Sequence, residues 1–338
     1  MKINRLIEAI GIESDKENYE YCKSRGFNII LSDFNKISNL GELIEDEGTL
    51  ILFNNSLIYN KNIFDFMHKI NAQKSHNIDI AIHDLHAKKL SLPLWKLLGG
   101  TSDKVATYGS GISPATADKT AEAALSAGHN ALKLKIGLDT ALDIQNISSL
   151  RRLLGKDGKL MVDANQAWTA ERAKAIIHKI ELFDLEWLEE PILADRPDDE
   201  WYSLADITDI PLAAGENIFG EDSFSHLVSE TYLGIIQPDL AKWGGFTKTV
   251  PLAKKIIASK KQYSPHFLGG GIGLLASAHA LAAVGGVGLL EVDCNPNPLR
   301  TAITEKFFDT SLNLMELGDQ PGLGIEPDWD SISAYQVL

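Results

Sequence analysis

The segment ALKLKIG, residues 131–137, decides how the rest of this sequence is interpreted. Apolar and basic residues alternate in it, which is the pattern of a short β-strand. Positions two apart on a strand share a face, so Lys133 and Lys135 point to the same side. Two neighbouring ammonium groups repel each other, and this repulsion favours the loss of a proton from one of them. The pair predicts either an edge strand protected by lysine or a lysine base beside a lysine that holds an anionic substrate. By itself the segment favours the edge strand.

The length and composition are those of a soluble globular protein. The 338 residues suffice for one large α/β barrel or two ordinary domains. A formal net charge of −14 argues against nucleic acid or an anionic membrane as partner. Cys22 and Cys294 form no motif, and residues 1–12 lack the pattern of a secretory signal. We therefore predict a cytoplasmic protein.

Residues 267–290 are nearly free of charge and long enough to cross a bilayer. They contain seven glycines, a density that disfavours a lipid-facing helix. We predict a glycine-rich loop, a helix of small residues and a strand in this region, and no membrane span.

From about residue 104 the chain alternates between short apolar runs and helical segments. Helices are predicted to begin at Pro114 and just after Thr169, because each follows a typical helix-start signal. This alternation predicts a parallel barrel of the TIM type, with a long open α/β sheet as the alternative. The eight predicted strands are 105–108, 131–136, 160–162, 185–188, 212–214, 234–236, 262–264 and 287–290.

The first 103 residues follow a different pattern. Apolar runs at 27–31 and 49–53 predict two short strands, and a helix is predicted from about residue 77 to before Pro93. His83 and His86 lie three apart on that helix. Because no third ligand is evident nearby, we interpret them as part of a solvated helix face and not as a metal site.

A titratable residue stands at or just after the end of each predicted barrel strand from the second onward. These residues are spaced 23 to 28 positions apart, about one β/α unit each. The carboxyl ends of barrel strands meet at one mouth, where active sites are built. Burying so many charges without compensation would be very costly, so a functional site is predicted. The residues are Lys135, Asp163, Glu189, Glu216, Asp239, His266 and Glu291.

Asp163, Glu189 and Glu216 come from three adjacent strands and would repel one another unless a cation lay between them. A set made only of oxygen ligands, with room for water and substrate, indicates Mg²⁺. The absence of His and Cys from these positions disfavours zinc. A ring of salt bridges with the lysines is the alternative interpretation.

Acid–base groups are predicted on both sides of these carboxylates. Lys135 lies on one side, and Asp239 with His266 lies on the other. An aspartate bonded to a histidine fixes the tautomer of the ring and raises its basicity. This arrangement suits removal of a proton next to a carboxylate, whose dianionic intermediate needs a metal ion and nearby cations. Lys133 would supply such a charge, and a protonated Glu291 could donate a hydrogen bond.

The sequence resembles the enolase superfamily, and within it the mandelate racemase subgroup (the mandelate racemase/muconate lactonizing enzyme family). The resemblance extends over about residues 77–338. It rests on KLK at 133–135, VDAN at 162–165, EEP at 189–191, GEN at 215–217, QPD at 237–239, KWGG at 242–245 and SPH at 264–266. Further matches are IDIA at 78–81 through LLGG at 97–100, and PGLGIE at 321–326.

This resemblance implies a modified (β/α)7β barrel over residues 104–314 and an N-terminal α+β capping domain over 1–103. The C-terminal tail, about 315–338, would complete the cap, which is shortened or divergent because the family's glycine- and tryptophan-rich meander is absent from 1–75. Asp163, Glu189 and Glu216 would bind Mg²⁺, with Lys135 as base and His266–Asp239 as the second acid–base pair. Lys133, Asn165 and Lys242 would contact a small-molecule carboxylate. The family also implies a homo-oligomer.

Three functions are compatible with these residues. The first is dehydration of a sugar acid, an aldonate or aldarate, to a 2-keto-3-deoxy acid, which is the commoner outcome in this subgroup. The second is a racemase or epimerase of a 2-hydroxy acid. The third is a catalytically impaired barrel that acts as a binding protein, which the divergent cap suggests and the intact motif set opposes.

Overall fold

The computed structural model describes residues 28–32, 49–53, 76–309 and 313–326. The chain divides into two compact units, 1–74 and 75–338. In the first unit, β1 (Asn28–Ser32) and β2 (Thr49–Phe53) pair in parallel, which confirms the two predicted strands to within one residue. The predicted capping-domain boundary at 103/104 and its C-terminal completion remain predictions.

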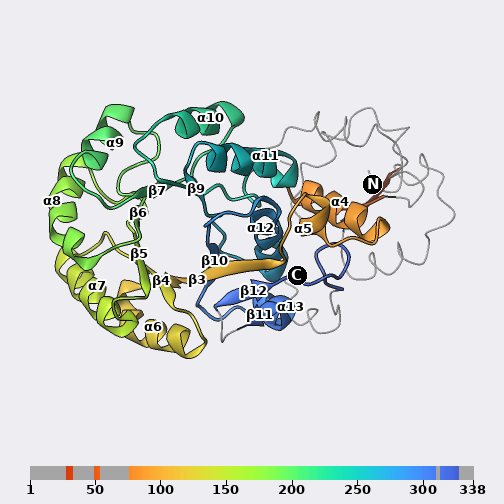
Figure 1. Ribbon diagram of the computed structural model, residues 1–338, viewed down its shortest axis with the longest axis horizontal. Helices are drawn as coiled ribbons and strands as arrows, with labels where there is room; N and C mark the ends of the chain where they lie inside the picture. The colour runs from red at the N-terminus through yellow and green to blue at the C-terminus, as the bar shows by residue number, and fades with distance from the viewer. Residues whose placement is uncertain (1–27, 33–48, 54–75, 310–312, 327–338) are drawn as a thin grey trace. The chain divides into compact units, whose positions relative to one another are not determined.

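Eight parallel strands in the second unit form one curved, TIM-barrel-like sheet, as predicted (Figure 1). Neighbours pair in chain order from β3 to β9, and β10 pairs with β3. The strands are β3 (Lys104–Ile112), β4 (Ala131–Lys135), β5 (Lys159–Asp163), β6 (Trp187–Glu189), β7 (Leu212–Ala214), β8 (Ile235–Ile236), β9 (Gln262–Tyr263) and β10 (Leu290–Asp293). Two short antiparallel strands, β11 (Phe308–Asp309) and β12 (Leu314–Glu316), extend the sheet beside β3.

The ladder of strand hydrogen bonds has a gap between β9 and β10. Here the hydroxyl oxygen of Ser264 accepts a hydrogen bond from the backbone N–H of Leu289 at 3.0 Å. Gly288 packs so closely that a Cβ atom on it would lie 1.9 Å from the carbonyl oxygen of Tyr263. The predicted strand at 287–290 is therefore wrong in its start: β10 begins at Leu290, and Glu291 lies inside it.

Helices alternate with the strands and form the outer layer (Figure 1). Thr169 caps α8 as predicted, because its hydroxyl accepts a hydrogen bond from the N–H of Arg172. A 3₁₀ turn, Pro114–Thr116, precedes α6 where a helix was predicted to begin at Pro114. The helices are α6 (Ala117–Ser126), α7 (Thr140–Leu154), α8 (Ala170–Ile180), α9 (Asp198–Ala205), α10 (Glu221–Ser229), α11 (Gly245–Ala258), α12 (Gly271–Val284) and α13 (Pro298–Thr304).

The predicted helix from about residue 77 is present as α4 (His76–Lys89), followed by α5 (Leu94–Leu97), and these helices pack on α11 and α12. Asp79 Oδ1 accepts hydrogen bonds from the N–H groups of Phe246 and Thr247 at the start of α11. The solvated face proposed for His83 is wrong: its side chain is buried and its ring packs against Phe246. The contact between α4 and α11 covers this face of the helix.

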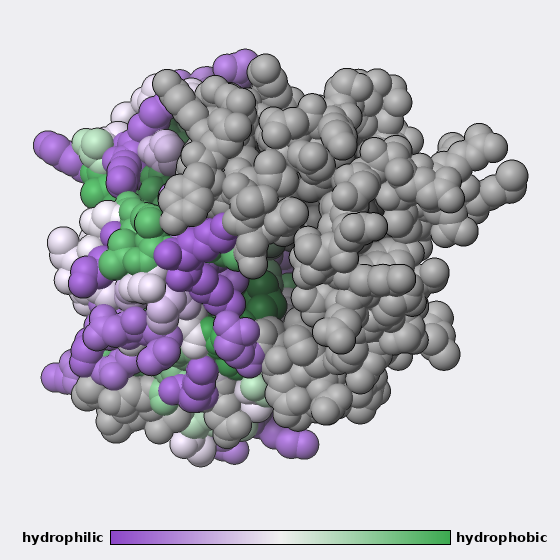
Figure 2. Space-filling view, turned by 90° about the vertical axis from the view of Figure 1, so that its right-hand side faces the viewer, coloured by the Kyte–Doolittle hydropathy of each residue, from purple (hydrophilic) through white to green (hydrophobic). Residues whose placement is uncertain are grey.

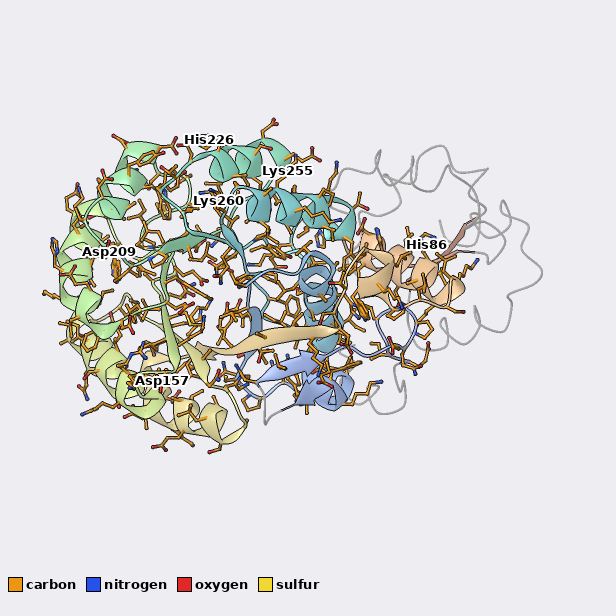
Figure 3. The ribbon with its side chains drawn as sticks, viewed as in Figure 1. His86, Asp157, Asp209, His226, Lys255 and Lys260 are labelled. Atoms are coloured by element: carbon orange, nitrogen blue, oxygen red, sulfur yellow. The ribbon has the colours of Figure 1, made fainter. Side chains whose placement is uncertain are left out.

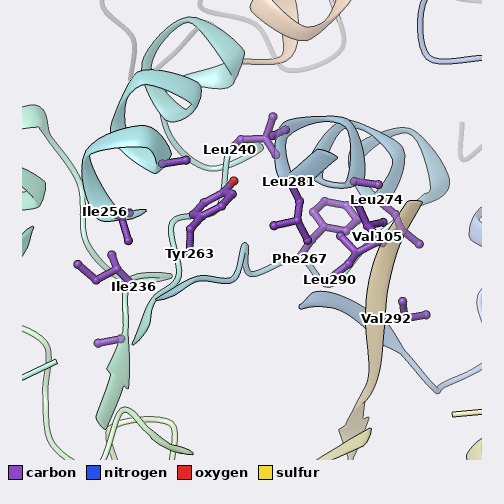
Figure 4. Packing of buried hydrophobic residues seen from close by; sticks show 14 of the residues in the cluster. Val105, Ile236, Leu240, Ile256, Tyr263, Phe267, Leu274, Leu281, Leu290 and Val292 are labelled. Carbon is purple, nitrogen blue, oxygen red and sulfur yellow. The ribbon is translucent and has the colours of Figure 1, made fainter. Parts of the chain in front are cut away.

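Apolar side chains fill both sides of the sheet. The larger core lies between the sheet and the helices, and Figure 4 shows the part formed by Phe267, Leu281 and Leu290 with their neighbours. Residues 267–290 contain the predicted loop and helix, α12, whereas the strand that follows begins only at Leu290. In the described part of the chain, no helix is long and apolar enough to cross a membrane. The coloured residues in Figure 2 show hydrophilic side chains around smaller hydrophobic areas.

His279 on α12 gives this core a testable pH dependence. The ring is fully buried, and its Nδ1 accepts a hydrogen bond from the N–H of Trp95 at 3.0 Å. Burial lowers the pKa of His279 from 6.5 to about 4. Above pH 6.5 the ring is neutral in both states. As the pH falls from 6.5 towards 4, the unfolded chain takes up a proton that the folded chain does not, so about 3 kcal/mol of stability is lost.

Urea unfolding between pH 7 and pH 4 checks this expectation. His279→Gln keeps an acceptor for the N–H of Trp95 but does not titrate. Its stability is expected to fall less steeply than that of the wild type over this interval. Equal slopes would contradict the assignment.

Candidate functional site

The interior of the barrel is built in layers. One apolar layer takes a residue from each of seven strands or their approaches, namely Tyr108, Ala131, Met161, Trp187, Ala213, Ile235 and Leu289. Side chains alternate along a strand, so residues two positions further on point to the same interior side. These residues include Ser110, Lys133, Asp163, Glu189, Gln237 and Glu291, and all six are buried. A layer of polar side chains thus lies directly above the apolar layer.

Lys133 lies between two carboxylates in this polar layer. Its Nζ is 2.6 Å from Glu189 Oε1 and 2.9 Å from Glu291 Oε1. Burial alone would lower the pKa of Lys133, but the charges of Glu189 and Glu291 outweigh it and raise the pKa well above its usual value. Lys133 is therefore a fixed cation and not an edge-strand lysine.

Lys135 occupies a different environment at the end of β4. A third of its side chain is exposed (33%), and its Nζ donates a hydrogen bond to Asn165 Oδ1 at 2.8 Å. The same nitrogen lies 3.7 Å from Asp163 Oδ2. The strand register places Lys135 directly opposite Asp163, which in turn lies opposite Glu189. The two lysines of the KLK segment therefore share a face but differ in access to the mouth.

Two of the three predicted metal ligands, Asp163 and Glu189, lie buried close together in the polar layer. Burial and the neighbouring charge of Glu189 raise the pKa of Asp163 to about 7. Glu189 accepts hydrogen bonds from Trp187 Nε1 at 3.0 Å and from Gln237 Nε2 at 2.7 Å, in addition to its contact with Lys133. A positive ion here would be stabilised, and the donors are all carboxylate oxygens, so the residue set fits Mg²⁺ in its chemistry.

The positions of the three carboxylates require an adjustment. Among the described residues, three metal-ligand atoms lie within 4.8 Å of one another only at another place, Asp198, His226 and Glu230. The carboxylate of Glu216 is directed towards two cationic side chains, because its Oε2 lies 2.6 Å from His266 Nε2 and 2.9 Å from Lys242 Nζ. Glu216 would turn from these cations towards Asp163 and Glu189 to complete the set.

His266 and Asp239 form the predicted pair. Nδ1 of His266 lies 2.8 Å from Asp239 Oδ2. Burial would lower the pKa of the ring, but the nearby carboxylates of Glu291, Asp239 and Glu216 raise it to about 10. In this arrangement the ring is therefore an imidazolium.

Glu291 acts as an acceptor in this structure. It accepts hydrogen bonds from the hydroxyl of Ser110 at 2.5 Å and from the N–H of Phe267 at 3.0 Å. Burial would raise its pKa, but the charges of Lys133 and His266 lower it. Donation of a hydrogen bond by a protonated Glu291 remains a prediction.

Glu190 is a further buried carboxylate that the sequence analysis did not place in the site. Both of its oxygens face Asn217 Nδ2, at 3.1 and 2.8 Å, and its backbone has a left-handed φ of 41°. Burial and the charge of Glu216 raise the pKa of Glu190 to about 8. The EEP segment contained this residue, but only the fold shows that it reaches the carboxylate group. Ser110 and Gln237 were missed for the same reason.

A family model described as "Enolase C-terminal domain-like" matches residues 116–331 of the chain. D-galactarolactone cycloisomerase of Agrobacterium fabrum is 28% identical over 77% of this chain and 73% of that protein. Arabinonate dehydratase of Saccharolobus solfataricus is 28% identical over 73% of this chain and 68% of that protein. L-Ala-D/L-Glu epimerase of Clostridium acetobutylicum is 28% identical over 88% of this chain and 81% of that protein.

Solved structures agree with the family match. A mandelate racemase/muconate lactonizing enzyme from Bordetella bronchiseptica superposes with a TM-score of 0.75 and 42% identity, over 81% of this chain and 77% of that one. A racemase from Streptomyces coelicolor with bound magnesium superposes with a TM-score of 0.70 and 25% identity, over 84% and 80%. The barrel, the ordered site residues and these matches lead to one conclusion. The chain belongs to the enolase superfamily and, within it, to the mandelate racemase/muconate lactonizing enzyme family.

Proposed function

We propose that this protein removes the proton α to the carboxylate of a sugar acid and dehydrates the product to a 2-keto-3-deoxy acid. One observation carries the proposal: Lys135 and the His266–Asp239 pair reach the mouth from different sides of a group of buried carboxylates. Lys135 ends β4, whereas Asp239 follows β8, four strands further round the barrel. A substrate between them would face a base on one side and an acid on the other.

The chain's residues divide the reaction into separate tasks. Lys133 would attract the substrate carboxylate, and Lys135 would take the α-proton. His266 would then give its proton to the departing β-hydroxyl, so that water leaves and the remaining enol becomes the keto acid. Asp163, Glu189 and Glu216 would hold Mg²⁺, which supplies positive charge to the enediolate oxygens when bound. Asn165 and Lys242, which bond to Lys135 and Glu216, would contact the substrate.

Epimerisation of a 2-hydroxy acid is the second candidate. Acid–base groups on both sides of the mouth could remove a proton from one face and return it to the other. The likeness to an epimerase and to a dehydratase at equal identity favours neither reaction. A binding protein without catalysis is the third candidate.

The cytoplasmic location and the homo-oligomeric state remain predictions. Light scattering on the purified protein would test the oligomeric state.

A screen of acid sugars in D₂O with Mg²⁺ separates these functions. The expected result is solvent deuterium at the α-carbon and a keto acid that a carbonyl reagent traps. Chelation of divalent ions is expected to abolish both signals, and added Mg²⁺ to restore them. An epimerase would change optical rotation without forming a keto acid. The enzymatic proposal fails if the wild-type protein exchanges the α-proton of no acid in the screen and Lys135→Met gives the same result as the wild type.

A further inference from the structure

A second group of metal-ligand side chains lies in the helix layer, on α9 and α10. Asp198 begins α9, and Glu230 immediately follows α10. His226 lies on α10 (Figure 3). Each offers one ligand atom, and the three atoms lie within 4.8 Å of one another. None of these residues belongs to the carboxylate group of the mouth, so the site is independent of the proposed function.

His226 faces one carboxylate with each of its ring nitrogens. Its Nε2 lies 3.1 Å from Asp198 Oδ1 and 3.0 Å from Oδ2, both within hydrogen-bond distance. Its Nδ1 lies 3.6 Å from Glu230 Oε1, which is longer than a hydrogen bond. Two ligand atoms at roughly 2.0–2.2 Å from one ion stand about 3–4 Å apart. The three atoms of this group lie within 4.8 Å of one another, so small movements would bring them to such separations.

Two tyrosines outside the group orient its carboxylates. The hydroxyl of Tyr232 donates to Asp198 Oδ1 at 2.9 Å, and that of Tyr202 donates to Glu230 Oε2 at 2.8 Å. Each phenol therefore holds one carboxylate oxygen, and both oxygens of Asp198 also lie within hydrogen-bond distance of His226 Nε2. The tyrosine rings pack edge to face, with centroids 5.1 Å apart. Fixed outer partners of this kind are typical of metal ligands.

A hollow of about 650 Å³ adjoins the group and is lined by Asp198, His226 and Tyr232. It extends to Gln166 and Asn217, on loops at the mouth. Half of the His226 side chain is exposed (51%), so water or another ligand can reach this position. The alternative interpretation is a surface histidine that contacts two carboxylates, an arrangement that does not require a tyrosine hydroxyl on each carboxylate.

We propose that Asp198, His226 and Glu230 bind a divalent transition-metal ion of the Zn²⁺ class. One imidazole nitrogen and two carboxylate oxygens are ligands that zinc accepts readily, and three protein ligands leave a position open to solvent. The mouth offers only oxygen atoms in its predicted ligand set and suits Mg²⁺. The two sites therefore differ in metal preference.

Calorimetric titration of the full chain with ZnCl₂, in saturating MgCl₂, tests this proposal. The wild type is expected to bind one zinc ion per chain. Asp163→Asn, which is altered only at the mouth, is expected to bind zinc in the same way. His226→Gln is expected to lose zinc binding. Tyr232→Phe is expected to weaken it by about 10- to 100-fold, because the phenol no longer orients Asp198.

His178→Gln is the matched control, because His178 is an exposed α8 histidine that lies 4.0 Å from one carboxylate, that of Glu181. It is expected to bind zinc as the wild type does. Thermal unfolding of every variant checks that the fold is retained. The proposal is overturned if the wild type binds no zinc under these conditions, or if His226→Gln and Tyr232→Phe bind it unchanged.

Discussion

Lys135→Met is expected to abolish α-proton exchange and product formation together, whereas His266→Asn keeps exchange and loses product formation. The loss of product is expected to be about 10²–10⁴-fold in each case. The reason is the division of roles between the two sides of the mouth. Under the proposed function the partly exposed Lys135 would take the α-proton, whereas His266, which contacts Asp239 through Nδ1, would donate a proton. Deuterium incorporation and keto-acid formation, measured on the same sample, separate the two steps.

Two exposed residues on α8 provide controls, because Lys179→Met and His178→Asn make the same changes far from the mouth. Both are expected to keep wild-type exchange and turnover. If His266→Asn loses exchange while Lys135→Met keeps it, the base and acid are assigned the wrong way round. If each variant loses exchange with only one of two epimers and no keto acid forms, the protein is an epimerase. If both keep full activity, neither residue is catalytic.

Lys133→Met is expected to cost about 3–5 kcal/mol of stability, because it leaves two buried carboxylates without their cation. Lys133, Glu189 and Glu291 are each at most 2% exposed in their side chains, so water cannot replace the lost partner. Urea denaturation measures the loss directly. For a unit of this size each kcal/mol lowers Tm by about 2–4 °C, so a fall of roughly 6–20 °C is expected.

Lys135→Met is the matched control for this experiment, because it makes the same change two residues along the same strand. Its stability is expected to stay much closer to the wild type, since Lys135 is partly solvated. The double variant Lys133→Met/Glu291→Gln is expected to recover part of the loss, because one uncompensated charge is removed. A Lys133→Met protein as stable as Lys135→Met would show that the buried ion pairs contribute little.

Most of the fold could be predicted because its signals are local. Short runs of three to six residues that are mostly apolar, separated by helices, indicate parallel strands, and seven of the eight barrel strands begin within two residues of the prediction. The start of the eighth strand was predicted wrongly. Gly288 and Leu289 are small or apolar, as strand residues often are, but they contact Tyr263 and Ser264 without joining the ladder of strand hydrogen bonds. The prediction of a solvated face for His83 was wrong because the helix that covers this face lies more than 160 residues away in the sequence.

The sequence by itself determined the order and identity of the predicted mouth residues, since each lies at or near the end of a strand, 23 to 28 positions after the one before it, and strands of one barrel end at one mouth. It did not determine their charges or distances. Burial and contacts between strands make Lys133 a fixed cation, leave Lys135 accessible and turn Glu216 towards His266. The Asp198–His226–Glu230 group depends even more on the fold, because two helices must pack before its atoms meet. The order of residues along the chain defines which chemical groups are present and how they are spaced, whereas their burial and mutual distances depend on every neighbour in space.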